Sequence, residues 1–167
     1  KSNFKNLKLG AKLELNGDLK DQDNPRLSWK LDETSLSSKF LYLNGISSKG
    51  RIVSNELRST LNIDSKIIKL KSDLLFNYKY KVPRTTFLAN ITRFDLNSIF
   101  SNFTNGKPIL KGVILSNFSG NSLDELNGEI KISSASIENE DKITSLNPIS
   151  IIQEFRDDQT LLKIENN

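Results

Sequence analysis

The sequence predicts an all-β protein built from long, mostly antiparallel strands. Three observations lead to this fold class. Apolar and polar residues alternate one by one over long stretches, short clusters of turn-forming residues separate these stretches, and few windows have helical periodicity. The 167 residues are about the length of a single domain, and no linker rich in proline or glycine divides them. We therefore expect residues 1–167 to form one unit.

The strongest alternation lies in residues 7–20 and 68–82. The odd positions of the first stretch and the even positions of the second are almost all apolar, whereas the positions between them are mostly polar. Because side chains alternate between the two faces of a strand, each stretch has one apolar and one polar face. A β-bulge at Gly10 or Gly17 would divide the first stretch. Shorter alternations begin at Leu27, Leu57 and Phe87 and continue around Ile130 and Ile164.

Turn-forming residues punctuate the chain, and one segment favours a helix. We expect turns at residues 21–25, Asn44-Gly45, Lys49-Gly50, Val82-Pro83 and residues 156–159. Residues 95–103 can form a short helix, because Asp95 is a good N-cap and apolar residues recur on one helical face. The helix would end before Gly106 and Pro108.

The composition excludes several classes of function. The chain has no cysteine, histidine or methionine, so catalysis by Ser-His-Asp or Cys-His groups and zinc sites of cysteine and histidine are excluded. The pairs Asp21/Asp23 and Asp157/Asp158 lack the surroundings of a calcium loop. The net charge is +4, but lysines are dispersed singly, which is typical of a solvated face and not of nucleic-acid binding. We expect no enzyme activity, no cofactor and no metal.

The apolar strand faces allow two interpretations. Two β-layers can cover each other in a closed β-sandwich, or one long curved sheet can leave its apolar face lining an open groove. A groove lined by aliphatic and aromatic side chains suits acyl chains, which need no directional polar partner. The candidate lining residues are Leu7, Leu9, Leu13, Leu15, Leu19, Leu27, Trp29, Leu31, Leu57, Leu61, Ile63, Ile68, Leu70, Leu74, Phe76, Tyr78, Ile130 and Ile132. Periodicity alone does not decide between the two interpretations.

One segment carries a family resemblance. Residues 120–132 read Gly-Asn-Ser-Leu-Asp-Glu-Leu-Asn-Gly-Glu-Ile-Lys-Ile, which resembles a recurring segment of TamB-type translocation and assembly proteins of the Bacteroidetes. Phe94-Asp95-Leu96, Lys111-Gly112-Val113 and residues 24–29 fit the same context. The resemblance covers roughly residues 10–165 and is clearest at residues 94–133.

The resemblance implies a fold, a location and partners. TamB-type proteins are similar to AsmA-like bridge proteins, whose long U-shaped sheet, or β-taco, has an apolar interior. They span the periplasm from an inner-membrane anchor to an outer-membrane barrel of the BamA/TamA type. They are implicated in phospholipid movement and in outer-membrane protein assembly. Because the chain opens on Lys1 and has no methionine, we expect an internal segment of such a repetitive β-sheet protein. Its expected partners are phospholipid acyl chains, and the barrel would be contacted by regions outside this chain.

Two alternatives come from other functional classes. The chain could be a structural or adhesive β-repeat region of a cell-surface protein. Adhesive repeats would show a clearer sequence period and more calcium-type aspartate loops than this chain has. It could also be a fragment of a β-helical carbohydrate enzyme, but no strand face collects carboxylates or aromatic residues.

Overall fold

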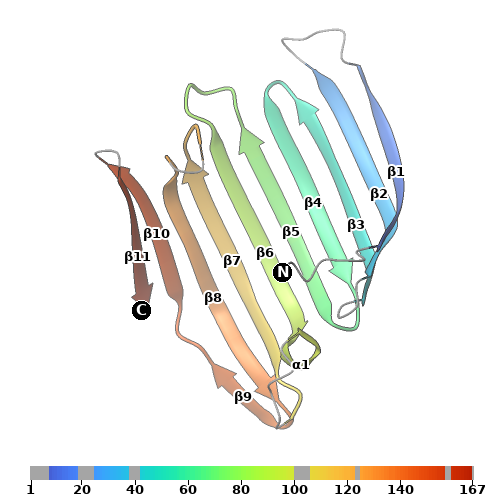
Figure 1. Cartoon of the computed structure of the whole chain (residues 1–167), viewed down its shortest axis with the longest axis vertical. Helices are drawn as coiled ribbons and strands as arrows, with labels where there is room; N and C mark the ends of the chain where they lie inside the picture. The colour runs from blue at the N-terminus through green and yellow to red at the C-terminus, as the bar shows by residue number, and fades with distance from the viewer. Residues whose placement is uncertain are drawn as a thin grey trace.

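The computed structural model describes residues 8–18, 25–37, 42–99, 106–122, 125–156 and 159–166. Within these residues, every strand belongs to one 11-stranded sheet, and all strand pairs are antiparallel. Figure 1 shows a single layer of long strands with β1 and β11 at opposite ends. The predicted all-β class with a long curved antiparallel sheet is confirmed.

The strands are long and follow one another closely. Their bounds are β1 Lys8–Asp18, β2 Arg26–Ser37, β3 Tyr42–Val53, β4 Glu56–Asp64, β5 Ile68–Asn77, β6 Arg84–Asp95, β7 Ile109–Ser119, β8 Asn127–Asn139, β9 Lys142–Ser145, β10 Ile149–Arg156 and β11 Gln159–Asn166. The one helix of the described residues is α1, Leu96–Ile99. Most of these strands are longer than the usual ~5–6 residues.

The topology is a meander. From β1 to β8 each strand pairs with the next in sequence. β9 and β10 then share one edge of β8: β9 pairs with Ser136–Asn139 and β10 with Gly128–Ile132. β11 completes the order beside β10. Every described strand contact is therefore between strands that are close in sequence.

The closed β-sandwich is not the arrangement found. In the described part of the chain no second sheet covers the first, and the only buried hydrophobic residues are Leu43, Ala89 and Ala135. A sandwich would bury large side chains between its layers. Here the large apolar side chains cover one another across the strands of a single sheet.

Two predicted turns are wrong. Asn44-Gly45 and Lys49-Gly50 lie inside β3, and the chain reverses instead at Ser54 and Asn55, whose φ angles are 51° and 63°. A two-residue hairpin of type I′ needs positive φ at both central residues, which these two provide. Of Asn44 and Gly45, only the glycine has positive φ. Gly45 lies in an irregular stretch of the β2–β3 pairing, where the register shifts on both sides of Thr34.

The second long alternation ends earlier than the sequence suggests. β5 stops at Asn77, so Tyr78 lies outside the strand and the expectation that the strand continues to residue 82 is wrong. The Asn77 side chain accepts a hydrogen bond from the Lys79 amide at 3.0 Å, and the Tyr78 amide donates to the Asn55 carbonyl at 3.0 Å. These bonds turn the chain towards Pro83, where a turn was expected.

The other local predictions have mixed outcomes. The β1–β2 register shifts between Gly10 and Lys12, which confirms the bulge at Gly10. Asp95 caps α1 as predicted, because its carboxylate accepts a hydrogen bond from the Ser98 amide at 3.2 Å. The predicted remainder of that helix, residues 100–103, lies outside the described residues, as do 21–24 and 157–158 of the predicted turns.

Candidate functional site

The strand register brings apolar side chains from nearly every strand onto one face of the sheet. Directly paired residues share a face, so the chain of pairs from Leu15–Trp29 in β1–β2 to Ile151–Ile164 in β10–β11 defines a continuous surface. We call it the apolar face. It comprises Leu13, Leu15, Leu27, Trp29, Leu31, Ile46, Ile52, Leu57, Leu61, Ile63, Ile68, Leu70, Leu74, Phe76, Phe87, Ile91, Phe94, Leu110, Ile114, Phe118, Ile130, Ile132, Ile137, Ile149, Ile151, Leu162 and Ile164.

Most of the sequence-predicted lining residues meet on this face. The exceptions are few: Leu7 and Leu19 lie outside the described residues, and Tyr78 lies beyond the end of β5. The backbone of Leu9 pairs with that of Leu36. The Tyr78 ring stacks on Phe76 with centroids 5.8 Å apart, so it borders the apolar face without being part of a strand.

The candidate lining residues left out five strands of the face. The alternation of β6 and β11 was recognised, at Phe87 and Ile164, but their residues were not among the candidates. β3, β7 and β10 contribute Ile46, Ile52, Ile114, Phe118, Ile149 and Ile151, none of which was a candidate. In β7 and β10 both alternating positions carry apolar residues, such as Val113 beside Ile114, and this blurs the period. In β3 serine and glycine interrupt it. In β10 the available signal was Ile149 and Ile151 at alternate positions.

Large and small residues are interleaved across the apolar face. Trp29 is paired with Gly50, Phe87 with Ser116, and Ile91 with Gly112. A Cβ on Gly50 would collide with three carbons of the Trp29 ring. The small residues are consequently among the best covered, with exposed fractions of 1% for Ala89 and 6% for Ser72. Large side chains thus fill the spaces above small ones and even out the surface.

The apolar face remains open to solvent. No large side chain of the described residues is fully buried. Leu13 and Leu15 of β1 are 56% and 63% exposed, and Leu162 and Ile164 of β11 are 64% and 68% exposed. A contiguous apolar surface of this kind on a protein usually marks an interaction site.

The opposite face is charged. We call it the charged face; its exposed ions include Lys12, Glu14, Lys30, Arg51, Arg58, Lys69, Lys71, Asp73, Lys131, Arg156 and Lys163. Several ion pairs join residues two apart on one strand, such as Lys12–Glu14 at 3.5 Å and Arg156–Glu154 at 2.9 Å. A side-chain hydrogen bond to Asp32 raises the pKa of Lys30, and one to Glu165 raises the pKa of Lys163.

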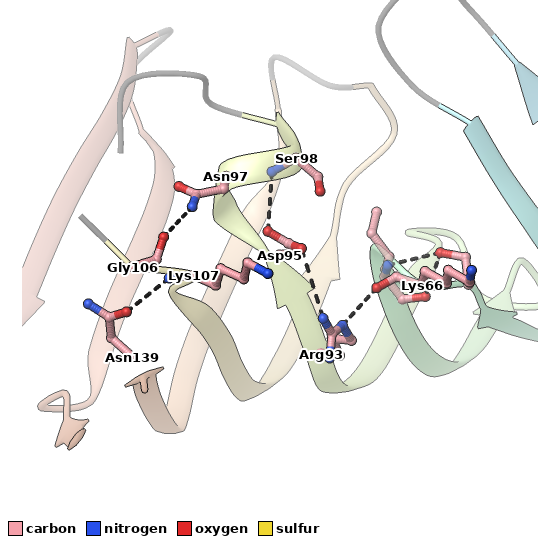
Figure 2. A network of polar contacts seen from close by, with 10 residues as sticks. Lys66, Arg93, Asp95, Asn97, Ser98, Gly106, Lys107 and Asn139 are labelled. Carbon is pink, nitrogen blue, oxygen red and sulfur yellow. Dashed lines mark hydrogen bonds and ion pairs between the residues drawn. The ribbon is translucent and has the colours of Figure 1, made fainter. Parts of the chain in front are cut away.

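Polar contacts secure one end of the sheet near α1 (Figure 2). The Arg93 guanidinium lies 3.9 Å from the Asp95 carboxylate and donates to the Lys66 carbonyl at 2.7 Å. The Asn97 side chain donates to the Gly106 carbonyl at 2.5 Å, and the Lys107 amide donates to the Asn139 side chain at 3.0 Å. These contacts connect the ends of β5, β6 and β8 with the segment before β7. We assign them a structural role.

The described residues contain no cluster of three or more aspartates or glutamates close enough to hold a metal ion. Nor is any helix among them long and apolar enough to cross a membrane. Comparisons with protein-family models, curated proteins and solved structures found no match to this chain. A broad aliphatic and aromatic surface offers contact with apolar groups and no group positioned to transfer a proton or attack a bond.

Proposed function

We propose that the apolar face binds the acyl chains of phospholipids and lets them pass along the sheet. The observation that carries this proposal is the continuity of the face: apolar side chains line it from β1 to β11, and they remain partly exposed. Each buried methylene group of a bound chain contributes about 0.8 kcal/mol. No catalytic step is part of the proposal.

The evenness of the face supports movement along it. Pairs such as Trp29–Gly50 and Phe87–Ser116 place a large side chain beside a small one, so that neither deep pockets nor ridges follow from the pairing. An acyl chain that meets similar surfaces at each strand has no single preferred position. Its binding energy therefore changes little as it moves from one strand to the next.

The resemblance to TamB-type proteins suggests where this happens. We propose that the chain is a segment of a periplasmic bridge protein anchored in the inner membrane of a Gram-negative bacterium. The bridge would conduct phospholipid towards the outer membrane and support outer-membrane protein assembly. Contact with a BamA/TamA-type barrel would be made by regions outside this chain. The residues quoted for the resemblance and the all-β fold are what support this assignment.

Site-specific crosslinking tests the proposal. A photoreactive residue at position 70 lies on the apolar face, whereas one at position 71 lies on the charged face of the same strand. With phospholipid vesicles, we expect lipid adducts at position 70 and few at position 71. Positions 13 and 12 of β1 form a second matched pair. Equal adduct yields at both members of each pair would contradict acyl-chain binding by the apolar face.

Charge insertion tests whether the face is open or covered in the working protein. We expect Leu70→Arg to leave the protein folded, because an arginine on an open face can extend its charged end into water. Lipid adducts at position 13 or 74 should fall. If another protein layer covers the face, the arginine is buried without a partner, which costs several kcal/mol and unfolds the protein. If Leu70→Arg unfolds the protein and the unsubstituted protein forms no lipid adduct, the result favours a structural or adhesive β-repeat.

A further inference from the structure

The charged face is hollowed where β2 to β6 run side by side. One hollow there has a volume of about 680 Å³, and its walls include Lys49, Arg51, Arg58, Asp73 and Leu75. Two smaller hollows of about 430 and 280 Å³ adjoin it. Arg51 lines all three, so it stands at their shared wall.

Two arginines face each other beside this hollow. Arg51 of β3 and Arg58 of β4 are directly opposite in the register, and like charges in that position destabilise a sheet. Arg58 is compensated by Glu56, whose carboxylate lies 2.5 Å from its Nε atom. Arg51 and the neighbouring Lys49 have no ion pair with another described residue. The site therefore has positive charge that an anion would neutralise.

The rest of the lining distinguishes among anions. The hollow has three cations and one carboxylate, that of Asp73. In the strand register Thr60 lies between Lys49 and Asp73. Part of its wall is apolar: Leu75 is directly paired with Arg58, and Leu88, which lies on the charged face, is 42% exposed. A free inorganic anion would leave these leucines in water. An anion with an apolar body would cover them.

We propose that this hollow binds an anionic amphiphile that carries a phosphate ester. The phosphate lies between the guanidinium groups of Arg51 and Arg58, which can each donate two parallel hydrogen bonds to it. The apolar body lies against Leu75 and Leu88. The site is on the opposite side of the sheet from Trp29 and the apolar face, so it does not depend on the proposed passage of acyl chains.

Titration with n-octyl phosphate tests this site. We expect n-octyl phosphate to bind more tightly than either inorganic phosphate or uncharged n-octyl glucoside. Only n-octyl phosphate can both pair with the two arginines and cover the two leucines. Arg51→Gln and Arg58→Gln should each weaken its binding at least about tenfold, since each removes a charge-assisted hydrogen-bonding group. Lys131→Gln removes a cation from the same face outside the hollow and should change binding little. Calorimetry measures each affinity.

Two further readouts separate this site from the apolar face and from general charge effects. Without ligand, Arg51→Gln should melt no lower than the unsubstituted protein, because it removes the repulsion with Arg58. The emission of Trp29, the single tryptophan, should stay unchanged on binding. Equal affinities of Arg51→Gln and Lys131→Gln, or equal binding of n-octyl glucoside, would overturn the proposal. A shift of Trp29 emission with retained affinity in Arg51→Gln would place the ligand on the apolar face instead, leaving the proposed function unaffected.

Discussion

Gly50 illustrates how single residues shape the apolar face. It is paired with Trp29, and any Cβ at this position would overlap the indole ring. Gly112 is different, because a Cβ there would lie 3.4 Å from Ala135, which is ordinary van der Waals contact. The same residue type therefore has a packing requirement at one position of the face and little at the other.

Substitution of the two glycines should separate these roles. We expect Gly50→Ala to displace the Trp29 ring and to lower the free energy of unfolding by about 1–3 kcal/mol, the usual cost of overpacking. Gly112→Ala should be close to neutral, because its methyl group has room. Thermal unfolding measures the stabilities, and Trp29 emission reports the ring. Equal melting temperatures for the two variants would show that the Trp29–Gly50 contact is unimportant.

The β3–β4 hairpin shows how an element depends on its turn. Ser54 and Asn55 both have left-handed φ angles, which favour the type I′ turn that matches the twist of long strands. A non-glycine residue in this conformation is strained by about 1–2 kcal/mol, less for asparagine. The Asn55 carbonyl also accepts the Tyr78 amide at 3.0 Å, which links this turn to the end of β5.

Changes at Asn55 should alter hairpin stability in opposite directions. We expect Asn55→Gly to raise the melting temperature, because glycine adopts positive φ without a steric cost and the backbone bond to Tyr78 is kept. Asn55→Val should lower it by an amount equivalent to about 1 kcal/mol or more, because a β-branched side chain clashes at this φ. Thermal unfolding followed by circular dichroism compares them. A higher melting temperature for the valine variant would contradict the turn assignment.

The whole molecule is a nearly one-dimensional assembly of strands. Each strand of the path β1–β8, β10 and β11 packs against its neighbours in the order, and no second layer ties distant strands together in the described residues. In such architectures stability is approximately a sum of local terms and nearest-neighbour terms. Among the described strands, β1, β9 and β11 have one partner each, β8 has three, and the others have two.

Hydrogen exchange should reveal this organisation. We expect the slowest exchange in β5, β6 and β7 and progressively faster exchange towards β1 and β11, because the sheet can open from its ends without disrupting the middle. Along β1, amides that bond to β2 should be protected and those on the outer edge should not. Amide exchange measured by NMR or mass spectrometry checks this. Uniform protection across all strands would contradict a single exposed layer.

The local sequence predicted the strands well and the turns less well. The alternation at residues 7–20 and 68–82 located β1 and β5, although the second ran past the end of β5, and Asp95 correctly marked the start of α1. The prediction of a turn at Asn44-Gly45 was wrong because a glycine with positive φ can occur in a β-bulge as well as in a hairpin turn. The candidate site was found in part: the predicted lining residues of β4 and β5 lie together, but the candidates included no residue of β3, β6, β7, β10 or β11.

Alternation along a regular strand depends only on backbone geometry, so the sequence alone established which residues of the clearly alternating strands share a face, such as Leu70 with Leu74. It also excluded histidine and cysteine chemistry. How the strands align depends on tertiary structure, because backbone hydrogen bonds form equally well in many registers. Only the folded sheet therefore shows that the apolar sets of successive strands merge into one surface, that no second layer covers it in the described residues, and that Arg51 meets Arg58 on the other side.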